Sequence, residues 1–102
     1  MDDIKTTIKE LKLLVELTSY AESASEKSSI RSQADSLLAR LEIYIHTKHR
    51  SDSRLLMAAR QLDVAIQQLL PAKSRSPAGQ VWFFNEAQKW LEVVTQQILQ
   101  DS

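Results

Sequence analysis

The fold is decided by the stretch Pro71-Ala72-Lys73-Ser74-Arg75-Ser76-Pro77-Ala78-Gly79, which contains both prolines and the only glycine of the 102-residue chain. Sheet proteins need such turn-forming residues every few positions, whereas long helices need few of them. Elsewhere the sequence has no proline or glycine that would break a helix. The sequence therefore predicts an all-α protein in which this stretch is the longest break.

Before this break, apolar side chains recur with the period of a helix in three segments, residues 3–22, 30–49 and 53–70. Pro71 ends the third segment, because proline lacks an amide hydrogen and clashes with the preceding turn. The polar residues 23–29 predict a loop between the first two helices.

Side chains that can cap a helix stand where these three segments begin. The first can be capped by Asp2 or Asp3, the second by Ser28 or Ser29, and the third from Ser51-Asp52-Ser53. Because the last of these links is so short, the second and third helices are expected to form an antiparallel hairpin.

A fourth helix is expected over residues 78–100, with two alternative starts. In the first, Pro77 lies in the first turn of the helix, where proline is tolerated. In the second, Asn85 caps the helix and the aromatic residues before it form a separate packed segment. Val81 and Phe84 are in phase with the apolar stripe of the fourth helix, which favours the earlier start.

Four amphipathic helices joined by short links predict an antiparallel up-down four-helix bundle, with residues 1–102 as one domain. The chain has no cysteine, which excludes disulfides and thiolate-bound zinc. No apolar run is long enough to span a bilayer, and the acidic start Met1-Asp2-Asp3 lacks the pattern of a secretory signal. A cytoplasmic location is therefore expected.

The scarcity of glycine argues against an enzyme, because phosphate-binding loops, oxyanion holes and nucleophile elbows use glycine backbone. We expect neither catalytic residues nor a cofactor. Glu42, His46 and His49 are spaced i, i+4 and i+7 on one helix face, a spacing that can share a metal. We interpret them instead as a solvated helix end, where histidines suit the negative end of the helix dipole. No metal site is expected.

Charge is balanced, with 13 basic and 13 acidic residues, although the middle of the chain is mildly basic and both ends are mildly acidic. Nucleic-acid binders usually show a larger local excess, so no nucleic-acid partner is expected. Lys73 and Arg75 in the long break, and the basic residues Lys48, Arg50 and Arg54, could touch an anionic membrane surface. Simple solvation of these charges is the alternative.

Four of the six aromatic residues lie in the short segment from Trp82 to Trp90. Both tryptophans are expected on the flanks of the apolar stripe, and a partly exposed tryptophan is a favoured contact anchor. The alternative is that these rings close one end of a small core. The candidate partner-binding residues are Trp82, Phe83, Trp90, Lys73 and Arg75.

The order of these segments resembles a known family. The segment Ser36-Leu37-Leu38-Ala39-Arg40-Leu41-Glu42-Ile43-Tyr44 is followed by a polar break, the leucine-rich Leu55–Leu70 segment, the proline- and serine-containing stretch and Ala87-Gln88-Lys89-Trp90-Leu91-Glu92. This layout is similar to that of the small immunity proteins that protect bacteria from pediocin-like (class IIa) bacteriocins, the enterocin A immunity-like family. The resemblance lies mainly in the leucine pattern and the step from Gln88 to Leu91.

The resemblance implies a non-enzymatic, cytosolic four-helix protein that recognises the bacteriocin-occupied mannose permease of the membrane. It also implies that the C-terminal half, here residues 71–102, selects the bacteriocin. The family is often net basic, whereas this chain is neutral. The chain is expected to be a monomer or a weak dimer. The alternative function is that of a small secretion chaperone or assembly adaptor, in which Leu13, Leu17 and Ile43 build a surface that holds a partner helix or forms a homodimer.

Overall fold

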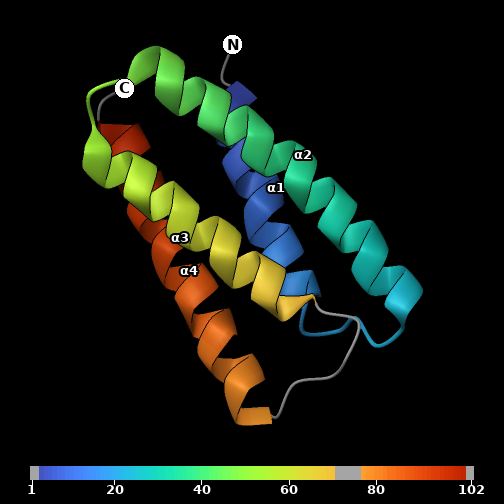
Figure 1. Cartoon of the computed structure of the whole chain (residues 1–102). Helices are drawn as coiled ribbons and strands as arrows, with labels where there is room; N and C mark the ends of the chain where they lie inside the picture. Colours follow the sequence, from blue (N-terminus) through green and yellow to red (C-terminus); the bar gives the residue numbers. More distant parts are fainter. Residues whose placement is uncertain (1–2, 71–76, 101–102) are drawn as a thin grey trace.

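The computed structural model describes residues 3–70 and 77–100 of the chain, which form four α-helices and no strand (Figure 1). The helices are α1 (Asp3–Leu17), α2 (Ala24–Lys48), α3 (Ser53–Leu69) and α4 (Pro77–Gln100). The predicted all-α class and the four-helix arrangement are confirmed, and the strict antiparallel up-down order stays a prediction. Among these helices, none has the length and apolar character needed to cross a membrane.

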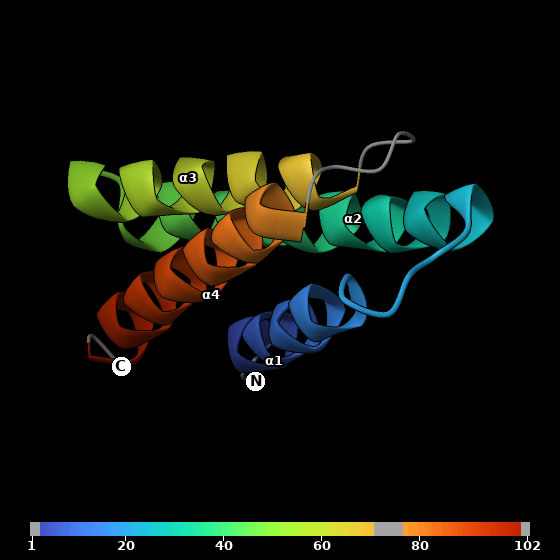
Figure 2. The same ribbon diagram turned by 90° about the horizontal axis from the view of Figure 1, so that it is seen from below.

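The helices form two layers with the core between them. Seen from below in Figure 2, α2 and α3 lie in one layer, and α1 and α4 lie on the other side. Each helix packs on the next one in sequence, and α4 also packs on α1. Of these four interfaces, the one between α3 and α4 is the most extensive and the one between α1 and α4 the sparsest.

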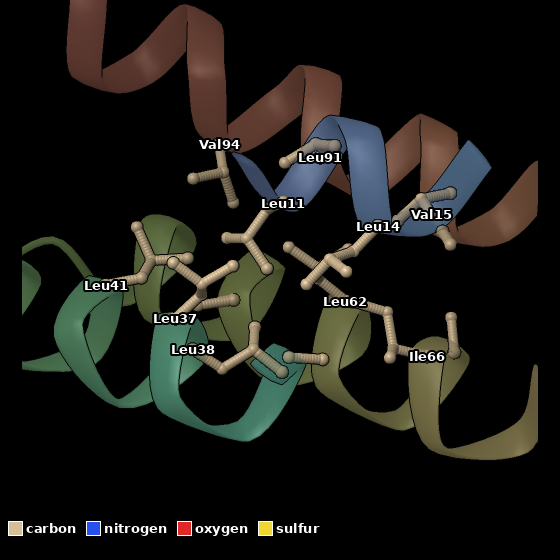
Figure 3. Packing of buried hydrophobic residues seen from close by; sticks show 14 of the residues in the cluster. Leu11, Leu14, Val15, Leu37, Leu38, Leu41, Leu62, Ile66, Leu91 and Val94 are labelled. Carbon is tan, nitrogen blue, oxygen red and sulfur yellow. The ribbon is translucent and has the colours of Figure 1, made fainter. Parts of the chain in front are cut away.

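The core is one continuous cluster of aliphatic side chains to which all four helices contribute. Figure 3 shows leucines and a valine of α1 facing leucines of α2, with α3 and α4 completing the cluster. Complete burial of one such side chain stabilises the fold by about 1.5–3 kcal/mol. The largest fully buried side chains are Leu11, Leu41, Ile45, Leu55, Leu62, Ile66, Leu69, Ile98, Val15 and Val94.

The first helix ends at Leu17, so the predicted end at residue 22 is wrong. The hydroxyl of Thr18 donates a hydrogen bond of 2.6 Å to the carbonyl of Val15. The amides of Ser19 and Tyr20 then donate to carbonyls three residues back, at 3.2 and 3.0 Å. These hydrogen bonds span three residues instead of the four of an α-helix, so the helix ends here. They also give the last carbonyls of the helix their hydrogen-bond donors.

The second helix begins at Ala24, so residues 24–29 are helical and the predicted loop over residues 23–29 is wrong. Ser23, rather than Ser28 or Ser29, is the N-cap: the amide of Glu26 donates to its hydroxyl at 3.1 Å. That hydroxyl donates in turn to the Glu26 carboxylate at 3.0 Å. The serine–glutamate spacing is a capping pattern, and it was visible in the sequence.

The starts of α3 and α4 agree with the sequence. Asp52 caps α3 by accepting a hydrogen bond of 3.0 Å from the amide of Leu55. The fourth helix begins at Pro77, so the earlier of its two alternative starts is confirmed and Asn85 lies inside the helix. Gly79 is helical and does not have a positive φ. Its conformational freedom is therefore not used.

Candidate protein-interaction site

The start of α4 presents exposed apolar side chains. In Figure 1 the first turns of this helix extend beyond the end of α3. Here Trp82 and Val81 are 58% and 59% exposed. We call these two residues the Trp82 patch. A tryptophan that is more than half exposed offers a large apolar contact area to a partner.

Phe83 supports the Trp82 patch from within the helix. Its ring meets the Trp82 ring edge-on, with centroids 4.9 Å apart and an interplanar angle of 89°. Phe83 and Phe84 are both half-buried against the core. The exposed indole is therefore held by a ring that is itself anchored, and less side-chain entropy is lost when a partner covers it.

The structure corrects the expectation for Val81, which the helical period placed in phase with the core. Phe84 does pack against the core, but Val81 is exposed. Periodicity shows which face of a helix is apolar, but it does not show how far a neighbouring helix reaches along that face. Near the start of α4, the neighbouring helices that the structure describes leave Val81 mostly exposed.

Trp90 has a different environment from Trp82. It is half-buried against the core, and its indole nitrogen donates to the Glu86 carboxylate at 3.4 Å. The ammonium of Lys89 lies 4.7 Å from its ring centroid. The helical rise places the two tryptophans about 12 Å apart along the axis. Trp90 is therefore largely engaged within the protein, and the two indoles do not form one patch.

Lys73 and Arg75, the two basic candidates, lie outside the described residues, so the structure does not place them relative to the Trp82 patch. Of the five candidate partner-binding residues, the structure brings two into direct contact, Trp82 and Phe83. Of the three candidates that the structure describes, Trp82 alone has a large exposed surface.

A second group of exposed apolar side chains lies on the opposite half of the chain. Leu13, Leu17 and Ile43, which the sequence places off the apolar stripes, are all exposed. Ile43 lines an open groove between α1 and the C-terminal half of α2, together with Thr6 and Arg40. Leu13, Leu17 and Ile43 are therefore apolar side chains that lie outside the core.

The possible metal ligands Glu42, His46 and His49 lie near the end of α2. His49 is the C-cap, with its amide bonded to the carbonyl of Ile45 at 2.8 Å and its ring 5.7 Å from that of Tyr44. His46 lies in the last helical turn, where a positive charge suits the dipole. Within residues 3–70 and 77–100, no group of three or more potential ligands comes together.

One polar contact between helices was not predicted from the sequence. The amide nitrogen of Gln67 in α3 donates to Asp35 of α2 at 2.7 Å and to Asp63 of α3 at 3.4 Å. Its side-chain oxygen is buried and has no hydrogen-bond partner in the part of the chain that the structure describes. The contact ties α2 to α3, and a residue separation of 32 positions gives no sequence signal for it.

Fold and surface together define a small all-α, four-helix protein with exposed aromatic and aliphatic side chains. No protein-family model, no curated protein sequence and no solved structure matches the chain.

Proposed function

We propose that this chain is a helical recognition protein that acts as a non-enzymatic immunity protein against a pediocin-like bacteriocin. The observation that carries the proposal is the exposure of Trp82 on a rigid helix, with its ring held by Phe83. Tryptophans in such positions are over-represented among the residues that dominate binding energy in interfaces.

The resemblance in segment order supplies the identity of the partner, a bacteriocin-occupied membrane permease approached from the cytoplasmic side. The Trp82 patch lies in the first turns of α4, which extend beyond the end of α3 in Figure 1, and both of its side chains are exposed. Lys73 and Arg75 precede this helix in the sequence. Near an anionic membrane surface, each such cation contributes about 1 kcal/mol, which would favour peripheral contact with the membrane.

The test is protection of living cells. The chain is expressed in a bacteriocin-sensitive strain, and the strain is challenged with a broad panel of pediocin-like peptides. We expect survival against at least one peptide. Unchanged killing across the panel, with the folded protein detected in the cells, would overturn the immunity function.

Two variants test whether the Trp82 patch is the contact. Trp82→Ala is expected to abolish protection, because it removes the exposed anchor. Tyr20→Ala is the matched control, since Tyr20 is an aromatic residue that is 76% exposed and follows α1. Equal protection by both variants would separate the function from this patch.

The exposure of Leu13, Leu17 and Ile43 favours a second candidate, a secretion chaperone or assembly adaptor that holds a partner helix. Light scattering of the purified chain distinguishes the two functions. A dimer or a co-purifying partner that is lost in Leu13→Ser/Leu17→Ser supports the adaptor function. A strict monomer without a partner contradicts it.

A further inference from the structure

A groove runs lengthwise between α1 and α4, along the sparsest of the four helix interfaces. Its first half has a volume of about 550 Å³ and lies between Val15 of α1 and Gln88 of α4. Its second half lies between Lys5 of α1 and Leu99 near the end of α4. Ile8 and Lys12 line both halves, so the two adjoin along α1. We call the whole depression the α1–α4 groove.

The floor of the α1–α4 groove is apolar. Ile8, Val15 and Leu91 line it and otherwise belong to the core. At one end, Leu99 is 41% exposed, so an apolar side chain is left partly uncovered inside the groove. An apolar floor bounded by two helices is the form that receives the apolar face of a further helix.

The wall formed by α1 is basic. Lys5, Lys9 and Lys12 are all exposed and line the groove. Their spacing of i, i+4 and i+7 places them on one helix face, at successive turns. The wall formed by α4 is mostly uncharged, and its single carboxylate, Glu92, accepts a hydrogen bond of 3.4 Å from Gln96. The groove therefore combines an apolar floor with one positively charged side.

We propose that the α1–α4 groove binds an amphipathic helix of a partner protein that carries acidic residues along the flank facing the three lysines. The groove extends from Lys5 to Val15, which corresponds to about 15 Å of helix axis and so to about three turns of a bound helix. Charge complementarity with Lys5, Lys9 and Lys12 specifies the acidic flank, and the floor specifies the apolar face. This site is separate from the Trp82 patch, so the inference does not depend on the proposed immunity function.

The experiment is an NMR titration of the full ¹⁵N-labelled chain with three stapled helical peptides of the same length and apolar face. Their flanks carry glutamates, glutamines or lysines. We expect the glutamate peptide to bind roughly tenfold more tightly than the lysine peptide, as several solvent-exposed ion pairs would give, with a preference that falls at high salt. The shifted amides should lie in residues 5–15 and 88–99.

Two charge-reversed variants, one in the groove and one elsewhere, test whether the peptide binds in the α1–α4 groove. Lys9→Glu/Lys12→Glu should reverse the preference, so that the lysine peptide binds more tightly than the glutamate peptide. The control, Lys27→Glu/Arg60→Glu, changes the net charge equally on α2 and α3, away from the groove, and should keep the original preference.

Four results would overturn the proposal. They are no binding of the glutamate peptide, equal binding of all three peptides, shifts centred on the Trp82 patch or on Leu17 and Ile43, and a concentration-dependent self-association that produces the groove shifts without peptide. Vesicles of anionic phospholipid serve as a further probe. If they alone reproduce the groove shifts while the glutamate peptide does not, the lysines contact a membrane surface and the helix-binding proposal is wrong.

Discussion

The two neighbours of α4 receive it in different ways. Against α3 it forms the most extensive interface of the protein, and alanines are buried on both helices, including Ala58 and Ala65 of α3 and Ala87 of α4. Small side chains let helix axes come close, because the distance between packed helices depends on the residues at the contact. Against α1 the interface is sparse and leaves the α1–α4 groove. One helix can thus have a closely packed side and an open side.

The largest expected effect comes from a cavity in the closed core. Leu62 of α3 is completely buried, and Leu62→Ala should lower the free energy of unfolding by about 2–5 kcal/mol. Urea unfolding followed by circular dichroism measures the loss. A cost below about 1 kcal/mol would mean that the core around α3 can collapse and is not closely packed.

Enlarging a side chain on each side of α4 tests the comparison directly. Ala87→Leu should destabilise by about 1–3 kcal/mol, because the completely buried site has no room for the added methyl groups. Thr95→Leu is the control, since Thr95 is only partly buried and lines the groove. We expect its cost to stay below that of Ala87→Leu in the same urea measurement. Equal costs would mean that the two sides of α4 are packed alike.

The exposed start of α2 depends on local hydrogen bonds instead. Ser23→Ala should cost about 1 kcal/mol, because the amide of Glu26 loses its acceptor. Ser28→Ala is the matched control within the same polar segment and should leave stability nearly unchanged, because Ser28 is an exposed position inside α2. Thermal unfolding of both variants provides the measurement. A larger loss from Ser28→Ala would restore the later start of this helix.

The smallest expected effect is at the Trp82 patch. Trp82→Ala should change the free energy of unfolding by no more than about 0.5 kcal/mol, since the side chain is mostly exposed. Trp90→Ala should cost clearly more, because that ring packs against the core and bonds to Glu86. Paired denaturant titrations compare the two losses. A large loss from Trp82→Ala would make this residue part of the core and remove it as a binding anchor.

The sequence predicts a helix boundary well where a helix-breaking or capping residue stands next to an apolar stripe. The starts of α3 at Ser53 and of α4 at Pro77 fall within one residue of the prediction. Boundaries were predicted poorly where the helix surface is polar all round, as in the first turns of α2, because an exposed turn has no apolar stripe to detect. There the only signal was the Ser23–Glu26 capping pattern.

Parts of the candidate site were also visible in the sequence. The spacing alone places Leu13, Leu17 and Ile43 off the core face, and all three are exposed. It does not separate Trp82 from Trp90, because both lie on the flanks of the α4 stripe. The different burial of Trp82 and Trp90 depends on whether a neighbouring helix covers the side of α4 on which each residue lies.

By itself, the amino-acid sequence determines that the chain is helical and which face of each helix is apolar, since helix breakers and a 3.6-residue period are local properties of the chain. Only the tertiary structure decides that α4 packs closely on α3 and loosely on α1, that Gln67 joins α2 to α3, and that three lysines line an apolar groove. These features arise between segments far apart in the sequence. They depend on how deeply each pair of helices can interpenetrate, and no local pattern encodes that depth.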